Sequence, residues 1–325
     1  MCDIGVSIIC NAYNHEKYIK DALEGFVMQR TTFPIEVLVH DDASTDNTAN
    51  IIREYEKKYP DIIKPIYQTE NQYSKDNGAV GKIQRSRARG KYIASCEGDD
   101  YWTDPYKLQK QFDAMEKHPQ YTMCAHAASI VEANTKKFIK TVSPMPEDGI
   151  LSIDDVILQG GGYVVTSSLL YRENLRNADM LFKKVINLDY TLQILGAVTG
   201  NGILYLSDNM SVYRWCSDNS WSVRMGKETK KMNDLTAKVN KMLEQLNKDT
   251  DFKYETVIKE RILKNRLYML IRTRDINEIK KGECRNLYFG KTLKERAKIN
   301  LKCRCPFMIE IYRKIKRCIG NIKKK

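Results

Sequence analysis

The sequence predicts an α/β fold whose sheet is mostly parallel and flanked by helices, followed by a basic helical extension. Short apolar runs alternate with helix-like stretches between residues 6 and 96, and the chain from residue 227 onward is polar with helical periodicity. Alternating strands and helices favour a parallel sheet, because each crossover helix packs back against the sheet. We therefore expect one α/β domain in residues 1–226 and a helical, basic extension in residues 227–325.

The expected elements follow from periodicity and from helix stop signals. Strands are runs of apolar residues, whereas helices carry apolar side chains at spacings of three and four residues. Pro60 ends the second helix, and Gly160 ends a later one. In chain order we expect strand 6–10, helix 17–28, strand 35–39, helix 48–60, strand 62–67, helix 81–89, strand 91–96, helix 152–160, strand 163–171, helix 189–198, and strands 203–206 and 210–213.

Composition narrows the class of protein. The 325 residues are 42% hydrophobic and 29% charged, which is typical of a globular protein with a full core. We expect neither a bilayer-spanning segment nor a secretion signal. The nine cysteines are scattered, which argues against a disulfide framework or a zinc site and favours a cytoplasmic location. Cys10, Cys96 and Cys124 fall in apolar runs, so we expect them to be small buried hydrophobes.

The positive charge is concentrated near the C-terminus. Residues 251–325 hold 23 Lys and Arg against 8 Asp and Glu, whereas the remaining residues hold 31 against 33. From Pro306 onward, apolar residues such as Met308, Ile311 and Ile315 recur at helical spacing between basic ones. A basic amphipathic helix can bind an anionic membrane, which would place the protein at the inner face of the cell membrane. The alternative is a helix that packs its apolar stripe on the α/β domain. No nucleic-acid-binding module is recognisable, so nucleic acid is not an expected partner.

Polar residues follow three of the expected strands. Asn11–Asn14 follows the first strand, His40–Asp42 the second and Glu97–Asp100 the fourth. Ligands of open α/β sheets bind beyond the carboxyl ends of the strands, so these segments should share one edge. Adjacent carboxylates favour a cation, and oxygen ligands suit Mg²⁺ or Mn²⁺, which commonly bind phosphate as well. This pattern predicts a nucleoside diphosphate site. The alternative is that the carboxylates cap helices or face solvent.

These segments, taken in order, resemble the family 2 glycosyltransferases of the GT-A fold. Val6–Asn14 is similar to the family's opening strand, Asp41–Asp46 to its nucleotide-binding turn, and Ala88–Trp102 to its metal-binding segment. The resemblance covers residues 4–222 and is nearest to bacterial enzymes of capsule, O-antigen and related surface polysaccharide synthesis. It implies a GT-A fold and inverting transfer of a sugar from a nucleotide-diphosphate sugar, UDP-sugar for this subgroup, to a hydroxyl of a saccharide or lipid-linked acceptor.

The resemblance implies a donor pocket built from two turns. Ala12, Tyr13 and Asn14 would line the base and ribose pocket, and either Asp41 or Asp42 would hydrogen-bond the base. Nothing in the sequence chooses between the two carboxylates.

The resemblance also implies a metal site after the fourth strand. Asp99 stands at the second position of the family's Asp-x-Asp motif and is the expected ligand of Mn²⁺ or Mg²⁺; Glu97 stands at the first position, and Asp100 is adjacent. Arg214 would contact phosphate, with a surface ion pair as the alternative. Cys216 replaces a histidine that ligates the metal in related sequences, and thiols are poor partners of Mg²⁺.

Asp189 falls where the family places its catalytic base. Inverting transfer needs a carboxylate that deprotonates the acceptor hydroxyl as it attacks. The alternative is that Asp189 caps the helix that follows it. Residues 161–168, with two glycines and Thr166, resemble the family's acceptor-side loop, although a tight turn would also explain the glycines.

Two other functions compete with an active transferase. The departures at Glu97 and Cys216 favour a non-catalytic nucleotide-sugar-binding scaffold of a polysaccharide assembly complex, whereas retention of Asp42, Asp99 and Asp189 favours catalysis. A nucleotidyltransferase would need a glycine-rich basic loop after the first strand, and the sequence there contains none.

Overall fold

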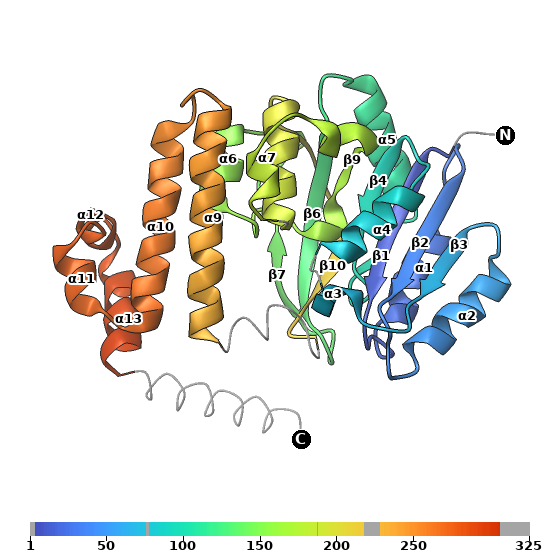
Figure 1. Cartoon of the computed structure of the whole chain (residues 1–325), viewed down its shortest axis with the longest axis horizontal. Coiled ribbons are helices and arrows are strands. Elements are labelled where there is room, and N and C mark those ends of the chain that lie inside the picture. Colours follow the sequence, from blue (N-terminus) through green and yellow to red (C-terminus); the bar gives the residue numbers. More distant parts are fainter. Residues whose placement is uncertain (1–3, 76–77, 187, 218–227, 306–325) are drawn as a thin grey trace. The chain divides into compact units, whose positions relative to one another are not determined.

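The computed structural model describes residues 4–75, 78–186, 188–217 and 228–305. The chain divides into two compact units, Met1–Arg224 and Met225–Lys325. The described part of the first unit is a sheet flanked by helices, and the described part of the second is helical (Figure 1).

Ten strands form the sheet within the described residues of the first unit. They are β1 (Val6–Ala12), β2 (Ile35–Asp41), β3 (Ile63–Tyr67), β4 (Tyr92–Ser95), β5 (Tyr101–Trp102), β6 (Met123–Glu132), β7 (Phe138–Val142), β8 (Gly149–Leu151), β9 (Leu170–Arg172) and β10 (Ile203–Trp215). Their order is β3-β2-β1-β4-β9-β6-β10-β5, with β7 beside β6 and β8 beside β10. The sheet is mixed and largely parallel, and its first four strands carry the predicted alternation with helices.

The parallel strands set the position of the site. β1 pairs in parallel with β2 from Val6 and Ile35 to Ala12 and Asp41, and β4 pairs in parallel with its other side. Parallel neighbours end at the same edge, so the polar residues after β1, β2 and β4 meet there.

Helices cover both faces of this sheet, as expected. They are α1 (Ile19–Val27), α2 (Thr48–Lys58), α3 (Gln72–Lys75), α4 (Ala79–Arg87), α5 (Lys107–Lys117), α6 (Ile153–Gln159) and α7 (Asp189–Thr199). On one face Ile19, Leu23 and Phe26 of α1 are fully buried in a core shared with β1, β2, β4, α2 and α5. On the other face Gln84 of α4 donates a hydrogen bond to the Leu38 carbonyl at 2.7 Å. Cys10, Cys96 and Cys124 are buried, which confirms their expected packing role.

The strand expected at 163–171 is shorter than predicted. Only its last two residues belong to β9, and residues Thr166–Ser168 form a short 3-10 helix, η1. The indole N–H of Trp102 donates to the Ser167 carbonyl, and the Gln111 amide donates to the Ser168 carbonyl, each at 2.9 Å. These side chains satisfy the backbone of η1, so that part of the segment needs no neighbouring strand.

The two strands expected at 203–206 and 210–213 are one strand, β10. Its pairing with β6 shifts register between Leu206 and Asn209 and again between Asn209 and Ser211. Asn209 donates a side-chain hydrogen bond to Ser129 at 2.7 Å. The polar residues that suggest a turn therefore form an irregularity within a continuous strand.

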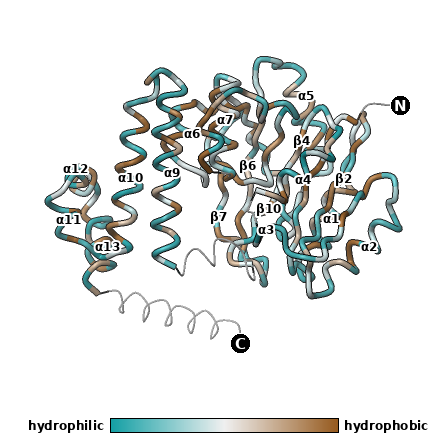
Figure 2. The backbone as a smooth tube through the Cα atoms, viewed as in Figure 1, coloured by the Kyte–Doolittle hydropathy of each residue, from teal (hydrophilic) through white to brown (hydrophobic). Residues whose placement is uncertain are grey.

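The second unit contains five described helices: α9 (Thr229–Asp249), α10 (Glu255–Thr273), α11 (Ile276–Lys281), α12 (Arg285–Phe289) and α13 (Leu293–Arg304). Hydrophilic and hydrophobic residues alternate along the turns of α9 and α10 (Figure 2). Leu267, Ile279, Tyr288 and Ile299 belong to a small core that joins α10 to α13. A capping box of Thr292 and Glu295 starts α13.

No helix among the described residues is long and apolar enough to cross a membrane. The basic amphipathic stretch expected from Pro306 lies outside the described residues.

Candidate functional site

Backbone hydrogen bonds join the turns after β1, β2 and β4. The amide of Asp42 donates to the Ala12 carbonyl, and the amide of Gly98 donates to the Asn11 carbonyl, each at 2.9 Å. The three polar segments predicted to share a sheet edge therefore do so.

The turn after β1 is fastened to the turn after β2. Asn14 adopts a positive φ of 55°, which asparagine tolerates better than most residues. The side-chain oxygen of Asn14 accepts a hydrogen bond from the backbone amide of Thr45 at 2.8 Å. The backbone amide of Asn14 donates to the Ser44 hydroxyl at 3.0 Å. Ala12 is buried at the end of β1, whereas the Tyr13 side chain is exposed. Tyr13 is therefore the member of this set with a ring free to contact a ligand.

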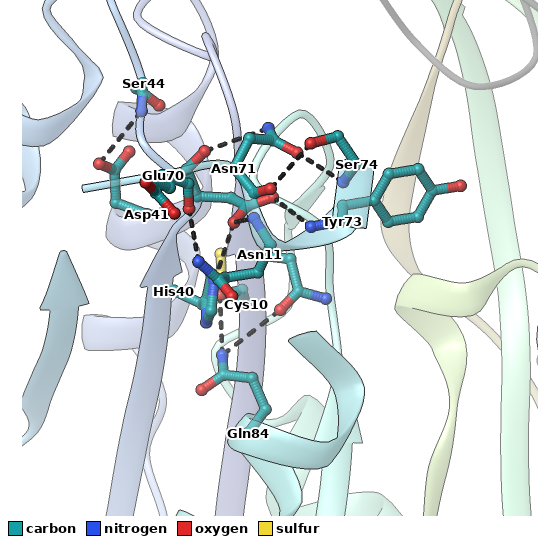
Figure 3. A network of polar contacts seen from close by, with 12 residues as sticks. Cys10, Asn11, His40, Asp41, Ser44, Glu70, Asn71, Tyr73, Ser74 and Gln84 are labelled. Carbon is teal, nitrogen blue, oxygen red and sulfur yellow. Dashed lines mark hydrogen bonds and ion pairs between the residues drawn. The ribbon is translucent and has the colours of Figure 1, made fainter. Parts of the chain in front are cut away.

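The two carboxylates after β2 have different surroundings, and Figure 3 shows Asp41 beside Ser44. The Asp42 carboxylate accepts from the backbone amides of Gln72 and Tyr73 at 2.7 and 3.1 Å, so it caps the start of α3. The imidazole of His40 lies 3.4 Å from the same carboxylate. Both carboxylate oxygens of Asp42 therefore already have partners in the protein, and they fix the position of the segment after β3.

Asp41 keeps an acceptor atom without a partner. Its Oδ2 accepts one long hydrogen bond of 3.4 Å from the Ser44 amide. Its Oδ1 is buried and has no hydrogen-bond partner among the described residues. Burial raises the pKa of the Asp41 carboxyl. A buried acceptor that lacks a donor in the protein fits a site where a ligand supplies the donor.

The turn after β4 concentrates carboxylates. Asp100 is buried, while Glu97 and Asp99 are partly buried. Burial, followed by the charges of Asp189 and Asp99, raises the pKa of Glu97 to about 8. Burial and the charge of Asp99 also raise the pKa of Asp100. The start of α7 lies near this turn, because Asp189 accepts a hydrogen bond from Thr166 of η1 and the next residue of η1, Ser167, accepts one from Trp102, two residues after Asp100.

The described residues contain no group of three His, Cys, Asp or Glu side chains arranged to hold a metal ion. Asp99 presents a partly buried carboxylate whose Oδ2 accepts from the Ser217 hydroxyl. A single hard oxygen ligand of this kind fits Mg²⁺ or Mn²⁺, which complete their shells with water and phosphate oxygens. Cys216 is exposed, with a positive φ of 64°, and Ser217 rather than Cys216 contacts Asp99.

Arg214 lies beneath the acidic turn. Its Nη1 donates to the Asp99 carbonyl at 2.7 Å, and its backbone amide donates to the Asp100 carboxylate at 2.9 Å. Its Nη2 pairs with Asp21 of α1, and its guanidinium stacks 4.4 Å from the centre of the Tyr101 ring. The ion pair that was the alternative for Arg214 therefore exists, but it is buried on the arginine side, where the side chain is only 1% exposed. The expected contact of Arg214 with phosphate stays a prediction.

Asp189 is the first residue of α7 and is exposed. The N-cap of α7 is Leu188, whose side chain makes no capping hydrogen bond, and Asp189 lies inside the first turn, so the capping alternative for Asp189 is wrong. Its Oδ2 instead accepts a hydrogen bond from the Thr166 hydroxyl of η1 at 2.6 Å. Thr166 therefore fixes one carboxylate oxygen of Asp189, and the carboxylate as a whole is exposed and accessible to a substrate.

Sequence reasoning missed several residues of the site. Ser217 donates a hydrogen bond to Asp99, and Asp21 is joined to the acidic turn through Arg214. Nothing in the local sequence around Asp21 or Ser217 predicts these contacts. His15 also belongs here: its Nδ1 is buried and lacks a hydrogen-bond partner among the described residues, and a Cβ added at Gly98 would lie 2.9 Å from it. The position of His15 directly after Asn14, at a strand end, is a signal that could have identified it.

A surface hollow of about 380 Å³ is lined by Ala88–Lys91 and Arg172–Asn174. It lies at the amino end of β4, whereas the acidic turn follows the carboxyl end of that strand. The hollow is therefore separate from the strand-end site.

An open α/β sheet with a carboxylate-rich edge at the carboxyl ends of its strands has its polar groups where folds of this class bind ligands. The sequence profile described as "Glycosyl transferase family 2" matches residues 7–175, which is more than half of the chain. The chain belongs to glycosyl transferase family 2.

Relatives and solved structures agree with this family. The chain is 39% identical over 216 residues to an uncharacterized protein of Mycobacterium tuberculosis, a match that covers 66% of this chain and 60% of the relative's length. TarS residues 1–349 of S. aureus, solved with UDP-GlcNAc, superpose with a TM-score of 0.60 at 18% identity, covering 92% of this chain and 79% of that one. The mannosyltransferase PcManGT of Pyrobaculum calidifontis, solved with GDP-Man and Mn²⁺, gives 0.52 at 14% identity, covering 93% and 87%. At these identities the two structures show the fold alone.

Proposed function

We propose that the chain is an inverting glycosyltransferase that moves a sugar from a nucleotide-diphosphate sugar to a hydroxyl of a saccharide or lipid-linked acceptor in surface polysaccharide synthesis. The observation that carries the proposal is the shared edge of β1, β2 and β4. There the unpartnered Asp41 oxygen and the Asp99 carboxylate lie in the turns on either side of the turn after β1. Asp189 is joined to the same region through η1, whose Thr166 donates to Asp189 and whose Ser167 accepts from Trp102. In this proposal Asp41 binds the nucleotide base, Asp99 binds the diphosphate through a metal ion, and Asp189 is the general base of the reaction.

The donor nucleotide binds along the turns after β1 and β2. Asp41 accepts a hydrogen bond from the base, because its Oδ1 is the buried acceptor that the protein leaves unpartnered. The N3–H of uracil is a donor suited to a carboxylate, so UDP-sugar is the proposed donor. Similar folds solved with UDP-GlcNAc and with GDP-Man support a nucleotide-sugar donor in general, and the choice of UDP rests on Asp41 and on the family resemblance. Tyr13 and Asn14 line the remainder of the pocket.

Mn²⁺ or Mg²⁺ binds at Asp99. Such an ion, when bound, neutralises charge on the leaving diphosphate. Asp99 is held in place by Ser217 through its carboxylate and by Arg214 through its backbone. Burial and neighbouring carboxylates raise the pKa values of Glu97 and Asp100, and a cation bound beside them would lower both pKa values, so that the ionised carboxylates would in turn favour the cation. PcManGT, which has a similar fold, was solved with GDP-Man and Mn²⁺, and this supports a metal in the proposed reaction.

Asp189 acts as the general base. Thr166 fixes one of its oxygens at 2.6 Å, and the carboxylate deprotonates the acceptor hydroxyl as that hydroxyl attacks the sugar. Attack from the face opposite the leaving diphosphate inverts the anomeric centre.

The acceptor side is proposed to lie near a membrane. A lipid-linked acceptor requires the enzyme to work close to a bilayer, and residues 306–325 add seven Lys and Arg against one Glu. We propose a cytoplasmic protein held at the inner face of the cell membrane through this tail. Removal of residues 306–325 should then release the protein from anionic vesicles at moderate salt, and unchanged binding would exclude the tail as the anchor.

Donor turnover tests the enzymatic proposal against a non-catalytic scaffold. The assay is release of nucleoside diphosphate from UDP-sugars with and without Mn²⁺. Asp99→Ala should abolish the metal-stimulated rate, and Asp189→Asn should lose transfer while it still binds nucleotide. Asp61→Asn, an exposed carboxylate outside the site, is the matched control. Wild-type binding of nucleotide without turnover on any acceptor preparation would favour the scaffold.

A further inference from the structure

The last described helix, α13, is apolar on two opposite sides. Ile299 and Cys303 face inward and are only 7% exposed. Leu293 and Leu301, which lie at a spacing of eight residues with Ala297 between them, face outward and are 77% and 39% exposed. An ordinary surface helix places polar residues opposite its buried stripe. The outward leucines are therefore not part of the small core that joins α10 to α13.

A row of lysines borders the outward leucines. Lys294, Lys298 and Lys302 recur every four residues, so they lie in one line along the helix beside Leu293, Ala297 and Leu301. All three lysines are exposed, and within the described residues none of them makes an ion pair or hydrogen bond. Residues 291–304 together contain six Lys and Arg against a single Glu. We call this set of six residues, Leu293, Lys294, Ala297, Lys298, Leu301 and Lys302, the α13 face.

The chemistry of the α13 face selects its partner. A second copy of the chain would set lysine rows against each other, which is unfavourable because like charges repel. A polyanion without apolar surface would satisfy the lysines and leave the leucines in water. An anionic bilayer satisfies both, because leucines enter the acyl boundary while lysines extend to the headgroups.

We propose that the α13 face docks on an anionic lipid bilayer surface. This proposal extends the membrane location proposed above from the C-terminal tail to a described helix. It does not depend on the transferase chemistry, since the test measures vesicle binding rather than turnover.

The test compares full-length variants in co-sedimentation with phosphatidylcholine vesicles, with and without phosphatidylglycerol. Wild type should bind only the anionic vesicles. Leu293→Asn with Leu301→Asn should weaken binding about tenfold or more, because two exposed apolar side chains are lost. Lys294→Glu with Lys298→Glu should weaken it at least about twentyfold, at about fivefold for each cationic charge lost.

A charge-matched control separates a local face from diffuse attraction. Lys238→Glu with Lys241→Glu changes two exposed lysines of α9, a helix without large exposed hydrophobic residues in the described part of the chain, and should bind nearly as wild type. Lys314→Glu with Lys316→Glu makes the same change in the C-terminal tail. Thermal unfolding of every variant checks that the fold is retained.

Four outcomes would overturn the proposal. Failure of the wild type to bind anionic vesicles would exclude membrane docking. Loss in the lysine variant with full binding in the leucine variant indicates a simple polyanion site, such as one for nucleic acid. An equal loss in the α9 control indicates diffuse charge. Loss confined to the tail variant assigns binding to the tail instead of the α13 face.

Discussion

The guanidinium of Arg214 donates a hydrogen bond to the backbone carbonyl of Asp99 at 2.7 Å. This contact joins the end of β10 to the turn after β4, 115 residues earlier in the chain. Because the same guanidinium pairs with Asp21 and stacks on Tyr101, it fixes the acidic turn against α1 and β5. The turn that is proposed to bind the metal thus depends on a residue from the far end of the sheet.

Replacement of Arg214 by Met should therefore affect both stability and ligand binding. Loss of the buried cation removes the hydrogen bond to the Asp99 carbonyl and one of the two cations that pair with the partly exposed Asp21, Lys136 being the other. We expect a cost of about 2 kcal/mol in the free energy of unfolding. Metal-dependent nucleotide affinity should fall as well, because Asp99 is no longer fixed. Urea unfolding and calorimetry measure the two effects. Arg30→Met, an exposed arginine over Tyr106, is the control and should change neither. Wild-type affinity in Arg214→Met would contradict the positioning role.

Thr166 should matter for turnover and not for donor binding. Thr166→Val removes the hydrogen bond that orients Asp189, and a charge-assisted bond of this kind contributes about 1.5 kcal/mol, or roughly a tenfold change in kcat. The KM for the donor should stay near its wild-type value. Thr166→Ser keeps the hydroxyl and should restore the rate. An equally slow serine variant would mean that Thr166 acts through packing instead.

Asp41 and Asp42 should respond differently to the same substitution. Asp41→Asn alters the unpartnered acceptor and should raise the nucleotide Kd about tenfold or more, with little change in stability. Asp42→Asn weakens the cap of α3 and should cost about 1 kcal/mol in stability, with the smaller effect on Kd. Isothermal calorimetry and urea unfolding of both variants decide the matter. The reverse pattern would assign the base contact to Asp42.

Lys107 should make stability depend on pH. Burial lowers the pKa of Lys107 from its usual 10.5 to about 7, and its ammonium contacts Gln111 and the face of Trp102. Above about pH 7 the folded chain has lost the proton of Lys107, whereas the unfolded chain still binds it. The free-energy penalty for burying the charged amine is therefore largest below about pH 7 and becomes smaller as the pH rises. The free energy of unfolding should rise by about 1 kcal/mol per pH unit between about pH 7 and pH 10.

The difference between wild type and Lys107→Met isolates this effect from other titrating groups. That difference, measured by urea unfolding across the same pH range, should carry the slope, and Lys57→Met at an exposed site should leave the slope intact. A pH-independent difference between wild type and Lys107→Met would show that the buried amine keeps its ordinary proton affinity.

The first four strands and the meeting of their polar ends follow from the sequence because their signals are local. Apolar runs mark β1, β2, β3 and β4, and the parallel-sheet rule then brings Asn11, Asp41 and Glu97 to one edge. The insertion of β9 between β4 and β6 could not be predicted, because antiparallel pairing across many residues leaves no periodic mark.

The parts of the site that sequence missed depend on long-range contacts. Arg214 pairs with Asp21 across 193 residues, and Ser217 reaches Asp99 across 118. Neither pair has a fixed spacing, so a local pattern predicts the acidic turn but not what holds it. The same reason explains why Asp41 and Asp42 look equivalent in sequence: only the position of α3 shows that Asp42 is occupied.

Calorimetry of UDP, GDP, CDP and ADP, each with and without Mn²⁺, tests the donor site most directly. The proposed function predicts metal-dependent binding of one nucleoside diphosphate, UDP, with the dependence on Mn²⁺ lost in Asp99→Ala. Absence of binding to all four nucleotides, by a chain that unfolds cooperatively and is therefore folded, would show that the edge formed by β1, β2 and β4 is not a donor site.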